Sequence, residues 1–289
     1  MPVFTRSELT PPNLLKHIAK IHGENYGDTD ISLITRVFND VLDLFNGKRA
    51  GFQRCDAKYH NLYHTMQTIP PFIEIINGWN ASGAVPKISS DFFAFGTIGV
   101  LLHDTGYIKE EGDDEGTGAK YTLTHVQRSI DFANMYLREI HLAPKRIPSV
   151  LNIIRCTGVT LDMNIHFHND QERIAGYALG TADLLGQMSS PDYIDSLAIL
   201  FNEFAESYKF EGVEQLHGKG STLFANVDEL IRSTPKFYEE IALKRFKMMG
   251  SMENYIPYSY DGKENPYMAA IEQNIATIKE KWGEQHGLR

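Results

Sequence analysis

Hydrophobic and polar positions follow a helical period along most of the chain. In residues 30–47 and 124–141, apolar side chains recur every three or four positions, which predicts amphipathic helices. Residues 89–106 are apolar almost all round, a pattern typical of a helix in the centre of a bundle. No segment shows the strict alternation of a half-buried strand. The sequence therefore predicts an all-α fold.

Prolines and glycines mark the ends of further helices. We expect a first helix at 11–27, beginning at its prolines and stopping at Gly27, while Pro70 and Pro71 predict a kink or break in a helix at 61–79. No linker rich in Gly, Pro or Ser divides the chain, so we expect one multi-helix domain. It would span 1–289, with a core at about 30–210 and a C-terminal helical extension at about 222–289. The remaining helices are expected at 147–159, 170–188, 191–210, 226–252 and 265–285.

Composition narrows the class of function. The chain of 289 residues carries a net charge of −9, which repels nucleic-acid backbones, so no nucleic-acid polymer is expected as a partner. No stretch approaches the roughly 20 apolar residues of a membrane span, and the first residues lack the apolar run of a signal peptide. The two cysteines, Cys55 and Cys156, form no CxxC pair, which favours a reduced, cytoplasmic location.

Polar residues interrupt two apolar helical segments. His103 and Asp104, in LLHDTG, end the apolar segment at 89–106, and Asp183, in GTADLLGQM, lies among alanines and leucines. Burying an unpaired imidazole or carboxylate is costly, so each of these groups is expected to have a partner. A divalent metal ion would satisfy all three.

The stretch KYHNLYHT contains His60 and His64, four residues apart. On a helix, positions i and i+4 lie on one face, so both imidazoles are expected to point the same way. The pair could supply two ligands to one metal, or one ligand and one acid, or two ordinary surface histidines.

Four of these side chains make a candidate metal site. Two imidazoles and two carboxylates suit Mn, Fe, Co, Ni, Zn or Mg, and the lack of a thiolate argues against a purely structural zinc site. A metal with open coordination positions can activate water and polarise a phosphoryl oxygen. The four candidate ligands are His64, His103, Asp104 and Asp183.

The order of these residues resembles the HD-domain superfamily of metal-dependent phosphohydrolases, in which a His, a His-Asp pair and an Asp lie on successive helices. His64 precedes His103 by 39 residues, and Asp183 follows Asp104 by 79 residues. The resemblance covers roughly residues 30–210. It implies a helical fold in which these four side chains hold a divalent ion.

YHNLYH also resembles the YHNxxH stretch of the cyclic-nucleotide phosphodiesterases, a branch of the same superfamily. The resemblance implies that His64 binds the metal and that His60 donates a proton to the leaving oxygen, which suits an imidazole near neutral pH. The sequence departs from that branch at Tyr107, where the phosphodiesterases have a further histidine, and their last aspartate lies farther along the chain. The expectation is therefore the superfamily rather than cyclic-nucleotide specificity.

A second metal ion is a separate hypothesis. Asp104 could bridge two ions, as the matching carboxylate does in two-metal members of the superfamily, and His125 is the leading extra ligand. His166 and His168, in NIHFHND, resemble the additional histidines of the HD-GYP branch in their order, but the GYP signature is absent. We therefore interpret them as loop residues.

These expectations combine into one functional hypothesis: a phosphohydrolase that uses a divalent metal, with His60 and Asp104 as catalytic residues and a small phosphate ester, such as a nucleotide, as substrate. The alternatives are a di-iron oxygenase, which would need His125 and a further ligand, and a non-catalytic module that binds a metal or nucleotide for regulation. The C-terminal helices could pack internally or form an oligomer. The acidic stretch at 110–118 is interpreted as a mobile, solvated loop rather than a lid, and the tyrosines of 255–260 as packing residues.

Overall fold

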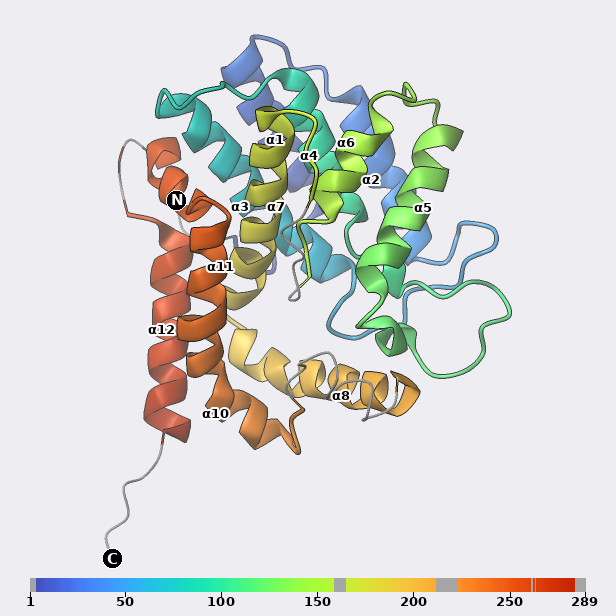
Figure 1. The fold of residues 1–289 in the computed structure, drawn as a ribbon, viewed down its shortest axis with the longest axis vertical. Helices are drawn as coiled ribbons and strands as arrows, with labels where there is room; N and C mark the ends of the chain where they lie inside the picture. Colours follow the sequence, from blue (N-terminus) through green and yellow to red (C-terminus); the bar gives the residue numbers. More distant parts are fainter. Residues whose placement is uncertain (1–3, 159–164, 212–222, 261, 263, 284–289) are drawn as a thin grey trace, which may run out of the picture.

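The computed structural model describes residues 4–158, 165–211, 223–260, 262 and 264–283 (Figure 1). Within these residues the chain forms eleven α-helices and no sheet, and an isolated antiparallel bridge joins Phe52 to Glu110. The predicted all-α fold is therefore confirmed.

Most of the helices lie where the apolar pattern predicts them. The α-helices are α1 (Pro11–Tyr26), α2 (Ser32–Phe45), α3 (Leu62–Ala81), α4 (Ser90–Leu102), α5 (His125–Glu139), α6 (Ile147–Ile154), α7 (Asp170–Met188), α8 (Tyr193–Glu211), α10 (Val227–Phe237), α11 (Leu243–Met248) and α12 (Pro266–Trp282). Short 3-10 segments are η1 (Thr105–Tyr107), η2 (Gly118–Tyr121) and η4 (Met252–Tyr260), and a π-helical turn is η3 (Tyr238–Ala242).

Helix α4 lies inside the bundle, as its uniformly apolar sequence predicts. It packs against α2, α3, α6 and α7. Phe93, Ile98 and Leu102 on this helix are fully buried, and burial of each such side chain contributes about 1.5–3 kcal/mol. Because α4 ends at Leu102, the two residues that follow it are delivered into the interior rather than to the surface.

Helices α3 and α7 cross at very short range. A Cβ atom on Gly186 of α7 would lie 2.6 Å from the carbonyl oxygen of Gln67 on α3, so only a glycine allows this contact. Gly186 lies three residues after Asp183, and Gln67 lies three residues after His64. The close crossing therefore brings two of the predicted metal ligands together.

Two details of the predicted helices differ in the structure. Helix α3 runs unbroken through Pro70 and Pro71, so the predicted break is wrong. Both prolines are buried, and the packing of α3 against α7 and η4 outweighs the local cost of the missing backbone N–H groups. The predicted helix at 226–252 is divided, because η3 separates α10 from α11. The predicted end of the first helix is confirmed, since Gly27 adopts a left-handed conformation with φ of 71° directly after α1.

The C-terminal helices pack along one side of the bundle. Helix α12 contacts α7 and α10, α10 also contacts α8, and η4 packs against α3 (Figure 1). Tyr255 of η4 lies against Trp79, with ring centroids 4.6 Å apart, and Ser259 donates a hydrogen bond to the backbone carbonyl of Glu74. The tyrosine-rich stretch thus packs the C-terminal segment onto the bundle. One continuous apolar core includes side chains from both parts of the chain, from Leu14 to Ile278.

The acidic stretch at 110–118 is tied to its surroundings by hydrogen bonds. Gln53 donates to the backbone carbonyls of Glu110 and Asp113, and Thr117 donates to the carboxylate of Glu206 on α8. Helix α8 lies across the end of the bundle where α7 ends (Figure 1). Among the helices of the described chain, none combines the length and the apolar character needed to cross a membrane.

Candidate metal centre

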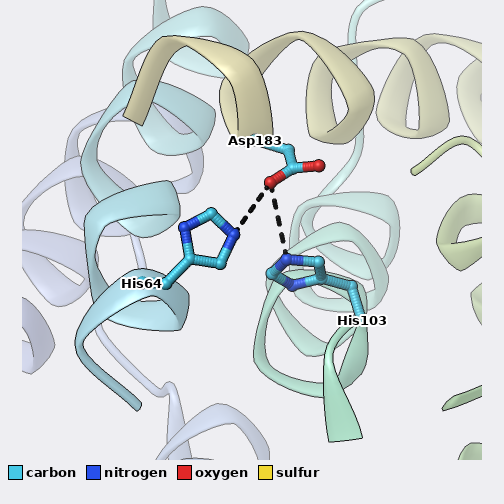
Figure 2. Close-up of side chains that lie close together, drawn as sticks. All are labelled: His64, His103 and Asp183. Carbon is cyan, nitrogen blue, oxygen red and sulfur yellow. Dashed lines mark ion pairs between the residues drawn. The ribbon is translucent and has the colours of Figure 1, made fainter. Parts of the chain in front are cut away.

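Three side chains from different helices converge in the interior (Figure 2). His64 comes from the first turn of α3, His103 directly follows α4, and Asp183 comes from the last half of α7. The Oδ1 atom of Asp183 lies 3.1 Å from Nε2 of His64 and 3.7 Å from Nε2 of His103. One ligand atom of each residue lies within 4.8 Å of the other two, so this group could hold a metal ion.

Asp104 completes the predicted set of four. Its Oδ2 atom lies 3.3 Å from Nε2 of His64 and 3.2 Å from Nε2 of His103. His64, His103 and Asp104 are between 1% and 3% exposed. These three side chains are thus removed from bulk water, while the side chain of Asp183 is 14% exposed. A charge in such a region is costly unless it is compensated.

The polar atoms that face one another in this group are placed as ligands of a cation rather than as hydrogen-bond partners. His103 Nε2, Asp104 Oδ2 and Asp183 Oδ1 are buried, and none of them has a hydrogen-bond partner in the described part of the chain. His103 Nε2 lies 3.2 Å from Asp104 Oδ2 and 3.7 Å from Asp183 Oδ1, without the alignment or distance that a hydrogen bond needs. Buried polar atoms are nearly always satisfied, so this arrangement fits ligands that share one central ion.

A backbone contact fixes the orientation of His103. Its Nδ1 lies 2.7 Å from the carbonyl oxygen of Val100, and since a carbonyl can only accept, Nδ1 carries the proton. In the neutral ring, Nε2 then presents its lone pair to the two carboxylates. Metal-binding histidines commonly use this arrangement, because a hydrogen bond on one nitrogen orients the other toward the ion.

The electrostatics of the group favour a positive charge at its centre. Burial lowers the pKa of His103, but Asp104 and Asp183 more than reverse this and raise it well above its ordinary value. Burial alone would raise the pKa of each of these two carboxyls, yet the facing imidazoles hold both pKa values below their ordinary range. Both aspartates are therefore ionised at neutral pH and able to compensate a cation.

His60 lies beside this group, just before the helix that carries His64. Helix α3 begins at Leu62, and the side chain of Asn61 caps it by accepting hydrogen bonds from the backbone N–H groups of Tyr63 and His64. The prediction that His60 and His64 share one helical face is therefore wrong. The capped turn still brings their ring centroids to 5.5 Å.

Glu203 on α8 is the partner of His60, and the sequence analysis missed it. The Nδ1 atom of His60 lies 2.6 Å from Oε2 of Glu203, while Oε1 accepts hydrogen bonds from the backbone N–H groups of Lys58 and Tyr59. Burial lowers the pKa of His60, but Glu203 overcomes this and raises it above its ordinary value. His60 is thereby held in a fixed orientation and favoured in its protonated form.

His125, at the start of α5, approaches the same centre from another side. Its Nε2 lies 3.8 Å from Oδ1 of Asp104, the oxygen that His64 and His103 do not face. Its Nδ1 donates to the carbonyl of Thr122 at 2.6 Å, so the neutral ring directs its Nε2 lone pair toward the carboxylate. Tyr107 stacks on both His125 and His60, with centroid separations of 4.6 and 4.4 Å.

The other two candidate histidines lie away from the centre. His168 pairs with Glu172, with Nδ1 3.0 Å from Oε2, and the backbone carbonyl of His166 accepts a hydrogen bond from Asn152. Glu172 precedes Asp183 by three turns of α7, which separates them by roughly 16 Å along the helix axis. His166 and His168 thus lie in the irregular segment just before α7, as the loop interpretation expects.

A cavity of about 80 Å³ adjoins His64. It lies between the start of α3, the end of α7 and the start of α8, and it has room for a few water molecules or a small polar group. Two cations, Arg6 and Lys58, contribute to its walls together with the side chains of Tyr59 and Gln187, which are joined by a hydrogen bond of 2.9 Å.

Comparison with known proteins leaves the centre as the main guide to function. No protein-family model matches the sequence, and no curated protein matches it either.

Proposed function

We propose that the protein is an HD-type, metal-dependent phosphohydrolase that cleaves a phosphomonoester or phosphodiester of a small molecule. The proposal rests on the convergence of His103 Nε2, Asp104 Oδ2 and Asp183 Oδ1, which are buried and lack hydrogen-bond partners in the described residues. With His64 they form a donor set of two imidazoles and two carboxylates. That set suits Mn, Fe, Co, Ni, Zn or Mg.

The four side chains have distinct tasks in this proposal. A divalent ion held by them would activate water and polarise a phosphoryl oxygen of the substrate. Asp104 and Asp183 supply the negative charge that allows a cation to be bound in a buried site. The Val100 carbonyl keeps the His103 ring turned toward that site.

His60 is the proposed proton donor. Its Nδ1–H is committed to Glu203, so the proton available for transfer is the one on Nε2. A phosphate ester that is cleaved at phosphorus leaves an alkoxide, and transfer of the Nε2 proton would neutralise it. General acid catalysis by a positioned side chain contributes about 10²–10⁴-fold to a rate.

A small phosphate ester is the substrate class that this surface supports. The net charge of −9 disfavours a long polyanion. The cavity beside His64 is lined by both polar and apolar atoms. Lys58 on its wall could receive a further anionic or hydroxyl group of the substrate, whereas Arg6 is paired with Asp192, 3.2 Å away, on the same wall.

Metal content and hydrolysis measured together test the proposal. The wild-type protein should bind at least one transition-metal ion per chain and hydrolyse a phosphate ester, and His103→Ala should lose both. His166→Ala removes an exposed histidine beside α7 and serves as the matched control, which should keep the metal and the activity. A wild-type protein that binds no ion after incubation with Mn, Fe, Ni and Zn would refute the proposal.

A di-iron oxygenase is the second candidate, and the position of His125 favours it. Asp104 presents Oδ2 to His64 and His103 and presents Oδ1 to His125, which is the arrangement of a carboxylate that bridges two ions. Iron near two per chain and visible absorbance after aerobic purification would support this candidate. Hydrolysis with one ion per chain and no such absorbance would exclude it.

A further inference from the structure

Arg245 on α11 is a buried cation that the proposed mechanism does not use. Its side chain is 7% exposed, and it pairs with no carboxylate in the described part of the chain. The guanidinium donates to the backbone carbonyls of Cys156, at 2.8 Å, and Gly158. Its Nε is buried and has no hydrogen-bond partner in the described residues. Two neutral carbonyls do not compensate a full positive charge, so among the described residues the guanidinium has no anion in contact with it.

The two carbonyls place the guanidinium near two helices that carry side chains of the metal centre. The Cys156 carbonyl lies against α7 at Gly180, because a Cβ there would lie 2.4 Å from its oxygen. Gly180 is almost one turn before Asp183. Gly158 lies against the first turn of α5, because its Cβ would lie 2.9 Å from Cγ2 of Val126, the residue that follows His125. The guanidinium thus donates hydrogen bonds to residues 156 and 158, which lie against the helices that carry Asp183 and His125.

The charges agree with this placement. Burial lowers the pKa of Arg245, and the negative charge of Asp183 opposes that shift. Once a divalent cation compensates Asp183, that carboxylate no longer balances Arg245. A second anion would then be favoured between the two cations.

We infer that Arg245 and the metal centre together form an oxyanion site that receives the phosphoryl group of the substrate. The inference deepens the proposed function and rests on it. A guanidinium is planar, always charged, and matched to the geometry of phosphate oxygens. The two carbonyls orient it, which lowers the entropy lost when it binds an anion. The C-terminal helices would accordingly complete the site rather than merely cover the bundle.

The competing interpretation is that Arg245 has only a structural role, in which its hydrogen bonds hold the residues after α6 against α11. Both interpretations predict lower stability when Arg245 is replaced, so stability does not distinguish them. Anion affinity does, because a fastening residue has no contact with the ligand.

Binding of inorganic phosphate to the Mn²⁺-loaded protein tests the inference. Calorimetry should show that Arg245→Gln weakens phosphate binding at least about tenfold while the Mn²⁺ content stays unchanged. Arg155→Gln is the matched control: Arg155 is exposed, directly precedes Cys156 and bonds Asn152, so phosphate affinity should remain that of the wild type. If Arg245→Gln does not fold, Arg245→Lys keeps the charge without the planar fork and should still weaken binding several-fold.

The possible results separate this inference from the proposed function. The inference would be overturned if the wild type binds no phosphate. It would also be overturned if Arg245→Gln or Arg245→Lys binds phosphate as tightly as the wild type. Both conclusions hold even if the protein hydrolyses esters. Phosphate binding that depends on Arg245, without turnover of any ester, would support the oxyanion site and refute the hydrolase. If hydrolysis occurs, Arg245→Gln should also raise KM, whereas Arg155→Gln should not.

Discussion

The His60 imidazole and the Glu203 carboxylate form a hydrogen bond of 2.6 Å across 143 residues of sequence. The acceptor is fixed, because Glu203 also receives two backbone N–H groups from Lys58 and Tyr59. Burial raises the pKa of Glu203, but His60 and these donors outweigh it and hold the pKa below its ordinary value. The carboxylate therefore stays ionised and supports a proton on His60.

Replacing Glu203 by Gln should move the pH dependence of catalysis. Without the carboxylate, the pKa of His60 falls, and the acid loses its proton at a lower pH. The alkaline limb of the pH profile of kcat should shift to lower pH, and kcat at pH 8 should fall by about tenfold or more. Metal content should be unchanged, because Glu203 is no ligand of the proposed ion. A profile that keeps its alkaline limb would show that His60 is not the proton donor.

The crossing of α3 and α7 at Gly186 sets the distance between His64 and Asp183. In Gly186→Ala, the new methyl group would meet the backbone of Gln67, which cannot move away as a side chain can. Overpacking of this kind costs about 1–3 kcal/mol, more than the roughly 1 kcal/mol that alanine gains as a better helix former. The variant should melt at a lower temperature and bind Mn²⁺ more weakly.

Gly176→Ala is the comparison for that prediction. Gly176 lies on the same helix, seven residues before Asp183. The new methyl group at this position would meet the side-chain sulfur of Cys156 instead of a backbone atom. It should lower the melting temperature without weakening Mn²⁺ binding. Equal loss of Mn²⁺ affinity in both variants would mean that the α3–α7 distance has no special effect on the centre.

The sequence predicts most of the helices and the candidate ligands that the structure brings together, for a definite physical reason. The apolar periods predict the helices, and a polar group in an apolar stretch predicts a partner, as with His103, Asp104 and Asp183. Glu203 offers the same signal less clearly. It follows the apolar run at 197–201 and precedes Phe204, but neighbouring Asn202 makes it resemble a surface acid.

Tertiary contacts hide the remaining features from sequence reasoning. Arg245 lies in the stretch LKRFKM, which looks like a basic, solvated helix face, and only the packing of α11 buries it. The position of His60 depends on the Asn61 cap, which starts the helix at Leu62, after His60, so the i, i+4 argument does not apply. The pairing of His60 with Glu203 depends on how α8 crosses the bundle, and no local pattern encodes that.

His125 decides between one and two ions. His64, His103, Asp104 and Asp183 hold the first ion in our proposal, so His125→Ala should keep one tightly bound Mn²⁺ per chain with an affinity within a few-fold of the wild type. If the wild type binds two, the variant should lose only the weaker ion. Titration of the metal-free protein with Mn²⁺ measures both numbers. Complete loss of Mn²⁺ in the variant would make His125 a ligand of the first ion and contradict this assignment.

Glu74 on α3 should make the folded state less stable as pH rises. The side chain is 2% exposed, its Oε2 lacks a hydrogen-bond partner in the described residues, and burial raises its pKa from 4.5 to about 7. His17 faces this carboxyl, with its Nε2 atom 3.9 Å from Oε1 of Glu74. Burial lowers the pKa of His17 to about 4, so its imidazole is neutral near pH 7 and does not pair with the carboxylate. Between pH 4.5 and 7 the unfolded chain binds fewer protons at this carboxyl than the folded chain, so stability falls through that window.

Glu74→Gln keeps the shape of the side chain and removes its charge. The variant should match the wild type near pH 4.5 and become more stable as pH rises, by on the order of 3 kcal/mol above pH 7. Urea unfolding at pH 5, 6, 7 and 8 measures this difference. Glu280→Gln, at an exposed position on α12, should differ from the wild type by a small amount that does not change across the same range. The opposite result would be a wild type that becomes more stable than Glu74→Gln as pH rises. It would mean that the Glu74 carboxylate is ionised and paired in the folded protein.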